Sequence, residues 1–157
     1  FDRVMVDVPC SGLGALRRRP EARWRKSPRD IAELLPLQRQ LQDAAIEATR
    51  PGGVIAYVTC SPHAAETQNI VAEVLESGAV SLLDSAAALR EVALHTEGAN
   101  GDPVSVLAGE KDPGHTPEIK VKKGAPVVKA SENPTTAQLW PHVHGTDAMF
   151  LALLRKN

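Results

Sequence analysis

The two cysteines of this chain stand in nearly the same local sequence. Cys10 lies in Asp7-Val8-Pro9-Cys10-Ser11-Gly12, and Cys60 lies in Val58-Thr59-Cys60-Ser61-Pro62. Each cysteine follows a short apolar run that is typical of a buried strand. Because ligands of open α/β sheets bind beyond the carboxyl ends of the strands, both thiols are expected to face one crevice. A thiolate in such a place is a candidate nucleophile.

Other interpretations of the two cysteines remain open at this point. Free cysteines are most often small buried apolar side chains. A disulfide between adjacent strands is conceivable, although a chain with so few cysteines is typical of a reducing compartment. A zinc site would need two more ligands, which His142 and His144 would have to supply, and there is no close Cys-x-x-Cys pair, so no metal is expected. A cysteine-protease site is disfavoured because His63 is too near Cys60 in sequence to act as its base.

A basic stretch follows Cys10 along the chain. Between residues 17 and 29 the sequence has seven basic residues and one acidic residue, Glu21, with Trp24 among them. The net charge of the whole chain is −1, so this excess of positive charge is local. The stretch indicates either a surface that meets nucleic-acid phosphates or a solvated loop that leads into a helix. The candidate phosphate ligands are Arg17, Arg18, Arg19, Arg23, Arg25 and Lys26.

The elements that position the cysteines follow from the apolar pattern. The runs at 3–8 and 54–58 lack clean alternation, which predicts central strands buried on both faces of a mostly parallel sheet. Between them, apolar residues recur at helical spacing from Leu34 to Ala48, and Pro51-Gly52-Gly53 ends that helix. A second helix is expected over about 65–77 and a short strand over about 80–83. The fold class is therefore α/β, built on a β-loop-α-β unit.

The second half of the sequence changes character. From about 97 to 136, glycines and prolines punctuate the chain and apolar residues thin out. This composition predicts a long irregular excursion, partly disordered, with one weak hairpin at about 119–128. Order is expected to return at the end, where 138–140 and 148–154 flank residues 141–147. This predicts either a last antiparallel pair or a strand with a structured approach loop.

The size and composition of the chain fit one globular domain. It has 157 residues, of which 43% are hydrophobic. It begins at Phe1 and runs directly into Val4-Met5-Val6, so we expect it to be part of a longer protein. No apolar run approaches the length of a membrane helix and no signal-peptide pattern is present. A cytoplasmic protein without membrane contact is therefore expected.

Four groups of residues together resemble the Fmu/Sun (Nol/Nop/Sun, RsmB-like) family of RNA 5-methylcytosine methyltransferases. They are Asp7 to Gly14, then Arg17-Arg18-Arg19-Pro20 with Trp24-Arg25, then Pro51-Gly52-Gly53 leading to Val58-Thr59-Cys60-Ser61, and finally Leu139-Trp140-Pro141-His142 with His144-Gly145-Thr146-Asp147. The resemblance covers about two-thirds of the chain, in the family's order. The Pro-Cys and Thr-Cys motifs are specific when both are present, whereas either one alone would be weak.

The resemblance implies a chemistry in which the two thiols have different roles. Cytosine C5 is too weak a nucleophile to take a methyl group unaided, so these enzymes add a thiolate to C6 and let C5 attack the methyl group of S-adenosylmethionine. By this resemblance Cys60 is the nucleophile, and Cys10 assists when the C5 proton is lost and the covalent adduct breaks. The basic residues would hold RNA phosphates while the base is flipped out.

The resemblance also implies places for the residues around the thiols. Asp7 and Pro9 are expected to contact the cofactor, and Asp7 also the amino edge of the cytosine, although Asp7 could instead be a carboxylate that caps the strand end. The segment 144–147 corresponds to a family loop near the active site. No chemistry is assigned to that segment, since a role in shaping the loop is at least as reasonable.

The resemblance finally indicates what residues 1–157 do not contain. In the family, a glycine-rich cofactor loop and two acidic residues that hold ribose and adenine precede the Pro-Cys strand. We therefore expect the C-terminal half of a Rossmann-like (class I) S-adenosylmethionine-dependent methyltransferase fold, with a mostly parallel sheet and a final antiparallel strand. This half alone is expected neither to bind S-adenosylmethionine tightly nor to methylate RNA. It should leave an apolar edge at 3–8, through which a dimer could form.

The expected function is methylation of cytosine C5 in RNA through a covalent bond between Cys60 and C6. Small-subunit ribosomal RNA is the first choice of substrate and transfer RNA the second. A non-catalytic RNA-binding module of the same fold would have dispensable cysteines, and a thiol redox protein would have a Cys10–Cys60 disulfide.

Overall fold

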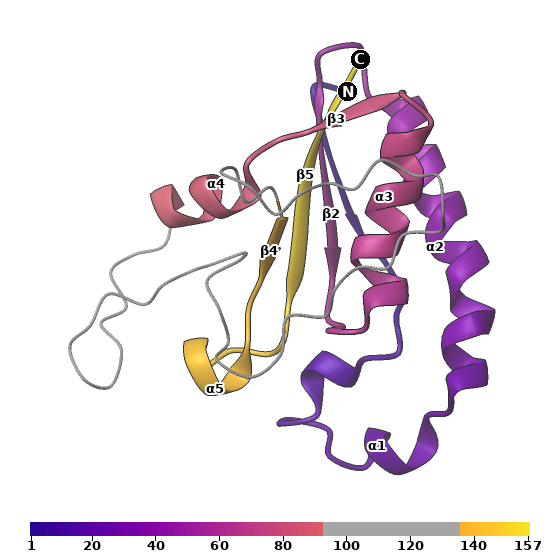
Figure 1. Cartoon of the computed structure of the whole chain (residues 1–157), viewed down its shortest axis with the longest axis vertical. Coiled ribbons are helices and arrows are strands. Elements are labelled where there is room, and N and C mark those ends of the chain that lie inside the picture. The colour runs from indigo at the N-terminus through magenta and orange to yellow at the C-terminus, as the bar shows by residue number, and fades with distance from the viewer. Residues whose placement is uncertain (93–135) are drawn as a thin grey trace.

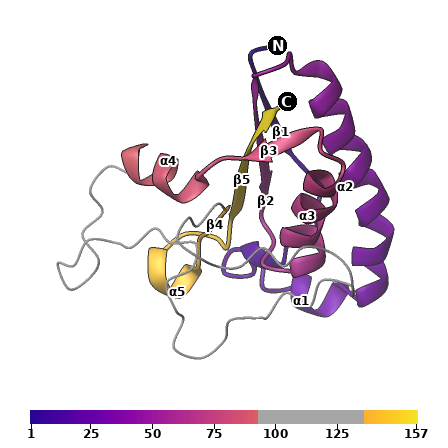
Figure 2. The same cartoon turned by 45° about the horizontal axis from the view of Figure 1, so that its top comes forward.

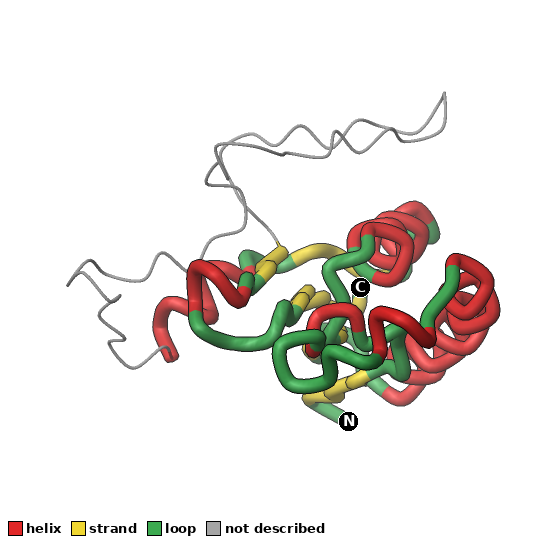
Figure 3. Tube along the Cα trace, turned by 90° about the horizontal axis from the view of Figure 1, so that it is seen from below, coloured by secondary structure: helices red, strands yellow, loops and turns green. Residues whose placement is uncertain are grey.

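The computed structural model describes residues 1–92 and 136–157, which form a five-stranded sheet with helices on both sides (Figures 1 and 2). The strands are β1 (Arg3–Asp7), β2 (Val54–Thr59), β3 (Val80–Leu82), β4 (Thr136–Gln138) and β5 (Phe150–Lys156). The α-helices are α1 (Ala22–Arg25), α2 (Pro28–Ala48), α3 (Gln68–Glu76), α4 (Ser85–Val92) and α5 (Pro141–His144). Two 3-10 turns are η1 (Leu13–Ala15) and η2 (Ala64–Glu66). Figure 3, which looks along the strands, shows α2 and α3 on one side of the sheet and α4 on the other.

Of the five described strands, β1 to β4 point the same way and β5 points the other way. The strand order is β1-β2-β5-β3, and β4 also pairs with β5. β1 and β2 are parallel, in a register that places Asp7 opposite Val58. β5 runs antiparallel to β2, β3 and β4, so it is the one described strand that points the other way. The predicted final antiparallel strand is therefore confirmed, and it lies inside the sheet, between β2 and β3.

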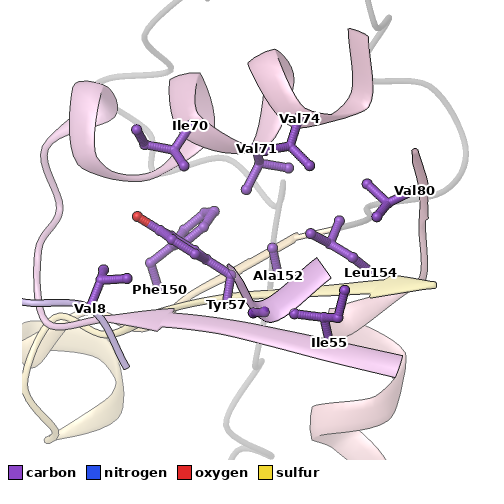
Figure 4. Close-up of a cluster of buried hydrophobic side chains, with 11 residues drawn as sticks. Val8, Ile55, Tyr57, Ile70, Val71, Val74, Val80, Phe150, Ala152 and Leu154 are labelled. Atoms are coloured by element: carbon purple, nitrogen blue, oxygen red, sulfur yellow. The ribbon is translucent and has the colours of Figure 1, made fainter. Parts of the chain in front are cut away.

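The hydrophobic core lies between the sheet and the helices α2 and α3. Figure 4 shows the part of it between the sheet and α3. Burial alternates along β2 and β5, so that Ile55, Tyr57 and Phe150 are fully buried and the residues between them are half-buried. The Tyr57 and Phe150 rings meet edge to face, with their centroids 6.3 Å apart, an arrangement that aromatic pairs favour. α3 contributes Ile70, Val71 and Val74 to this cluster. The core thus fixes β2, whose end carries Cys60.

The edge strand β1 is more exposed than predicted, but it does present the predicted apolar edge. Exposed residues alternate with half-buried ones along β1, and Met5 is 73% exposed. The prediction that this strand is buried on both faces is therefore wrong for the chain as it stands. Among the described strands β1 pairs with β2 alone, so 3–8 does present an apolar edge. A dimer through this edge stays a prediction.

α2 begins at Pro28 rather than at Leu34. The Asp30 carboxylate accepts hydrogen bonds from the Ser27 N–H at 2.7 Å and from the Ser27 hydroxyl at 2.6 Å. Pro28 occupies the first helical turn, where its missing N–H costs nothing. These local contacts start the helix before its apolar face becomes periodic.

The remaining predicted elements are found with shifted limits. The helix predicted at 65–77 is η2 followed by α3, and the strand at 80–83 is β3. The final pair is β4 with β5, but residues 139–140 lead into α5 rather than extending β4. α4 was not predicted. The hairpin at 119–128, and all of the excursion at 97–136 except Thr136, lie outside the described residues. No helix within residues 1–92 and 136–157 is long and apolar enough to cross a membrane.

Candidate active site

Cys10 and Cys60 meet at the end of the sheet to which β1 and β2 point. Because the two strands are parallel and Asp7 pairs with Val58, the loops that follow them start side by side. The two Sγ atoms are 3.4 Å apart, within hydrogen-bonding distance for sulfur. The structure therefore brings the two predicted catalytic thiols together.

The other interpretations of the cysteines have different outcomes. Both thiols are free and partly exposed, so they are neither a disulfide nor fully buried core residues. The ring Nδ1 of His63 accepts a hydrogen bond from the Ala65 N–H at 3.2 Å, so this side chain caps η2. Among the described residues, no three His, Cys, Asp or Glu side chains are grouped as metal ligands.

The two thiols share a hydrogen bond and therefore titrate as a pair. The Cys60 thiol stabilises a thiolate on Cys10 and lowers the pKa of Cys10 from 9.0 to about 6, although burial opposes this change. The same hydrogen bond raises the pKa of Cys60, and burial raises it further. Near neutral pH the pair thus holds one proton and one negative charge. Moving that proton from Cys60 to Cys10 would place the thiolate on Cys60 with no change in total charge.

Alkylation of Cys10 by iodoacetamide should report the first deprotonation of the pair. Because the thiolate is the reactive form, the rate should be low at acidic pH, rise through a midpoint of about 6 and then level off. Cys60→Ala removes the hydrogen-bond donor, so the midpoint should move up toward 9.0. Peptide mass spectrometry measures the labelling of each cysteine. A midpoint that is the same with and without the Cys60 thiol would contradict the shared proton.

Asp7 and Pro9 lie beside the thiol pair on the β1 side. Asp7 is the last residue of β1 and is exposed, and its negative charge is the smallest of the causes that raise the pKa of Cys60. Pro9 is exposed, and its carbonyl accepts a hydrogen bond from Gln38 Nε2 at 2.9 Å. Both residues are therefore exposed next to the thiols. Their contacts with a cofactor or a base stay predictions.

Gly14 connects its own loop to the Cys60 loop and to the segment at Ala148 by hydrogen bonds. Its N–H donates to the Cys60 carbonyl at 2.9 Å, and its carbonyl accepts from the Ala148 N–H at 2.9 Å. A Cβ atom at this position would lie 2.7 Å from the Cys60 carbonyl oxygen and would also collide with the Ala148 carbonyl. Residue 14 must therefore be a glycine for the backbones to approach this closely.

The segment after α5 supports the start of the basic stretch. Arg18 Nε donates to the Asp147 carboxylate at 2.8 Å, and Arg17 Nε lies 3.9 Å from the same carboxylate. Arg17 also donates to the Gly145 carbonyl. Asp147 is the main cause that raises the pKa of Arg18, and a charge on Cys60 adds to it, so this guanidinium lies within electrostatic reach of the thiol. A loop-shaping role for 144–147 agrees with these contacts.

The rest of the basic stretch is open to solvent. Arg19, Arg23, Arg25 and Lys26 are all exposed. Trp24 is 83% exposed, and the Arg23 guanidinium lies 5.5 Å from the centre of its ring. α1, which carries most of these residues, lies at the same end of the sheet as the cysteines (Figure 1). We call residues 19 and 23–26 the basic surface.

Glu66 in η2 is a site residue that sequence reasoning missed. It is fully buried, and its carboxylate contacts Ser11 and Ser61, which are the residues that follow the two cysteines. The sequence signal for such a residue is the repeated Cys-Ser pair. If both serine hydroxyls are buried behind the thiols, they need a hydrogen-bond acceptor. No spacing rule assigns that acceptor to a glutamate.

Comparison with known sequences places the chain in a family. A family model described as 16S rRNA methyltransferase RsmB/F matches residues 1–155. A putative methyltransferase of Mycobacterium tuberculosis (strain H37Rv) is 47% identical over 156 residues, which are 99% of this chain and 26% of the relative. A probable ribosomal RNA small subunit methyltransferase B of Synechocystis is 49% identical over 67 residues, which are 43% of this chain and 15% of the relative. The chain thus spans about a quarter of the length of the mycobacterial relative.

Solved structures share the fold. The crystal structure of PH0851 superimposes with a TM-score of 0.67 and 28% identity, over 99% of this chain and 26% of that chain. The crystal structure of NSun6 from Pyrococcus horikoshii with SFG gives a TM-score of 0.61 and 22% identity, over 97% of this chain and 29% of that chain. These likenesses agree with the predicted Rossmann-like methyltransferase fold. Since the family model covers nearly all of its residues, the chain belongs to the RsmB/F family of 16S rRNA methyltransferases.

Proposed function

We propose that this chain is the C-terminal, thiol-bearing part of the catalytic domain of an RNA cytosine-C5 methyltransferase. The observation that carries the proposal is the pair of thiols 3.4 Å apart, whose hydrogen bond lowers the pKa of Cys10 and raises the pKa of Cys60. A reaction that needs a nucleophile at one step and a proton carrier at another suits such a pair. Relatives named as small-subunit ribosomal RNA methyltransferases make ribosomal RNA the first choice of substrate, and transfer RNA stays the second.

The proposed roles of the two thiols follow from their shared proton. The proton moves from Cys60 to Cys10, and the Cys60 thiolate forms a bond to cytosine C6, which makes C5 electron-rich. After C5 has been methylated, Cys10 gives the proton it carries to water and, as the thiolate, takes the proton from C5. The electron pair of that C–H bond forms the C5–C6 double bond, the bond between Cys60 and C6 breaks, and its electron pair returns to Cys60. Cys10, adjacent to Cys60, is the group that exchanges protons during this release. Arg18 lies near enough to stabilise negative charge on Cys60.

The cofactor is proposed to approach from the β1 side. S-adenosylmethionine, when bound, supplies the methyl group. Asp7 and Pro9 are exposed next to the thiols, so this side of the site is open to a ligand. NSun6 from Pyrococcus horikoshii, which shares the fold, was crystallised with SFG, an analogue of S-adenosylmethionine. Tight binding of the cofactor is proposed for the full-length protein, not for residues 1–157 alone.

Release of tritium from cytosine C5 tests the proposed reaction. The full-length protein is incubated with S-adenosylmethionine and small-subunit ribosomal RNA that carries tritium at C5 of cytosine. Methylation at C5 must replace that atom, so label should appear in water together with 5-methylcytosine in the RNA. A methyltransferase that acts on another atom, or a non-catalytic RNA-binding module, would leave the label in place. Transfer RNA as a parallel substrate separates the two substrate choices.

The basic surface is proposed to hold RNA phosphates, together with Arg17 and Arg18, while the exposed Trp24 ring stacks on an unpaired base. Replacing Arg19, Arg25 and Lys26 together with Ala should weaken binding of an unstructured RNA oligonucleotide by about tenfold at low salt. The slope of affinity against salt should fall by about 0.7 for each lost phosphate contact. Fluorescence anisotropy of a labelled oligonucleotide measures both quantities.

A matched variant controls for a general loss of positive charge. Arg50 is exposed and pairs with Asp2 at the opposite end of the sheet, so Arg50→Ala should leave RNA affinity unchanged. Trp24→Ala should lower the affinity without changing the salt slope, because stacking involves no phosphate. If Arg50→Ala weakened RNA binding by as much as each substitution of the triple variant does on average, the proposed RNA-binding role of the basic surface would be wrong.

A further inference from the structure

The serine that follows each cysteine turns inward behind the thiol pair. Ser11 is 2% exposed and Ser61 is 0% exposed, whereas both cysteines are partly exposed. The two hydroxyl oxygens are 3.4 Å apart, the same separation as the two sulfurs. The two Cys-Ser pairs therefore lie side by side, with the thiols toward the open side of the site and the hydroxyls toward the interior.

One carboxylate binds both serines. Glu66 Oε2 accepts hydrogen bonds from the Ser11 and Ser61 hydroxyls, each at 2.6 Å. Glu66 Oε1 accepts from the Ser11 N–H at 2.7 Å and from Gln38 Nε2 at 3.1 Å. Burying an ionised group is costly unless such donors surround it. The four hydrogen bonds explain how a fully buried glutamate is accommodated here, and they fasten the two cysteine loops to one point.

Glu66 is itself held by the scaffold. The Tyr57 hydroxyl, on a core residue of β2, donates to the Glu66 carbonyl at 2.8 Å. Gln38 of α2 is fully buried and also donates to the Pro9 carbonyl at 2.9 Å, so it links Glu66 to the residue before Cys10. The contacts of Glu66 therefore reach β2, α2 and both cysteine loops.

We propose that Glu66 is a positioning residue, which holds Cys10 and Cys60 at the separation at which one proton passes between their sulfurs. The proposal deepens the function proposed above and rests on it for its catalytic meaning. Glu66 does not touch the reacting atoms, since its partners are the two serines and Gln38. We call Glu66, Ser11 and Ser61 the carboxylate clamp.

The position of Glu66 and its negative charge have opposite effects on the pKa of Cys10. The hydrogen bond from Cys60 is the largest cause that lowers the pKa of Cys10, and it depends on the distance between the sulfurs. The negative charge of Glu66 is the smallest cause and raises that pKa. If Glu66 acted through charge alone, its neutralisation would lower the pKa of Cys10. If Glu66 acts by holding the two sulfurs close together, its replacement raises the pKa of Cys10. Because the hydrogen bond from Cys60 is the larger cause, we expect the pKa of Cys10 to rise.

Glu66→Gln in the full-length protein tests the clamp. Glutamine keeps the size of the side chain but replaces one acceptor oxygen with an N–H donor that faces hydroxyls already donating. The midpoint of Cys10 alkylation should rise from about 6, and the turnover in the tritium-release assay should fall by about 100-fold, as misplacing a reacting group by about 1 Å can cause. KM for S-adenosylmethionine should stay unchanged, because the clamp lies behind the thiols. Ser61→Ala, which deletes one hydroxyl of the clamp, should raise the midpoint less.

Glu73→Gln is the matched control, because Glu73 is a glutamate on the outer side of α3 that pairs with Arg39. It should change neither the midpoint nor the turnover. A folded Glu66→Gln protein whose midpoint stays at about 6 or falls would overturn the proposal. If Glu66→Gln does not fold, a folded Ser61→Ala protein with an unchanged midpoint would overturn it as well. If Glu66→Gln raises the midpoint but the full-length protein without substitutions releases no tritium from RNA, the proposed function is refuted and the clamp stands.

Discussion

Cys60→Ala in the full-length protein is expected to abolish methyl transfer, whereas Cys10→Ala is expected to leave a covalent complex between protein and RNA. Without Cys60 there is no thiolate to add to C6, so C5 does not become reactive. Without Cys10 the pair loses its shared proton, and the remaining Cys60 thiol titrates nearer to 9.0. A minor fraction of Cys60 is still ionised at neutral pH, and a cysteine thiolate is nucleophilic enough for this fraction to react. The adduct therefore forms slowly and then persists, because its release is impaired.

A denaturing gel distinguishes the two variants. Cys10→Ala should give a band shifted by the mass of the RNA, and the shifted fraction should grow as the pH is raised toward 9.0, where more Cys60 is ionised. Cys60→Ala should give no shifted band at any pH. The double variant is the control and should also give none. If the two phenotypes are exchanged, Cys10 is the nucleophile and the assignment of roles is wrong.

Gly14→Ala is expected to destabilise the described fold by about 3 kcal/mol, because forcing extra volume into a tight contact costs roughly this much. The new Cβ would lie 2.7 Å from the Cys60 carbonyl oxygen, where the neighbour is backbone and cannot turn away. Relief of the collision requires the Cys60 loop or the Ala148 segment to move. The hydrogen bonds that Gly14 makes to both segments would then weaken. Urea unfolding followed by far-UV circular dichroism measures the loss.

Gly78→Ala separates the effect of collision from that of backbone strain. Gly78 has a φ of +71°, but no atom lies within 4 Å of a Cβ placed there. Its replacement should cost only the strain of a left-handed residue, about 1 kcal/mol, and should leave thiol reactivity intact. Gly14→Ala should instead also shift the midpoint of Cys10 alkylation upward. Equal destabilisation by the two variants, with unchanged thiols in both, would contradict the close packing at residue 14.

Local patterns in the sequence were enough to predict the thiol site. The apolar runs before Cys10 and Cys60 predicted two neighbouring parallel strands, and the shared crevice followed from that topology. The early start of α2 is also encoded locally, because Ser27, Pro28 and Asp30 are a helix-start signal that lies ahead of the periodic apolar residues.

Contacts between distant segments were not predictable in the same way. Glu66 meets Ser11 across 55 positions of sequence, and Asp147 meets Arg18 across 129. No local pattern specifies which carboxylate will neutralise which donor, since that depends on how η2 and the segment after α5 pack. The alternating burial of β1 is likewise set by the neighbours the strand has in the sheet, not by its own residues.

The central claim, that the Cys60 thiolate adds to C6 of cytosine, is tested most directly by locating the covalent bond. The full-length protein without substitutions is incubated with S-adenosylmethionine and RNA that contains 5-fluorocytosine, in which fluorine at C5 cannot leave as the proton does. The adduct is then digested and its peptides are analysed by mass spectrometry. We predict that the peptide with Cys60 carries the modified nucleotide and that the peptide with Cys10 is unmodified. A nucleotide on Cys10, or the absence of any adduct in a protein that methylates the unsubstituted RNA, would contradict the account.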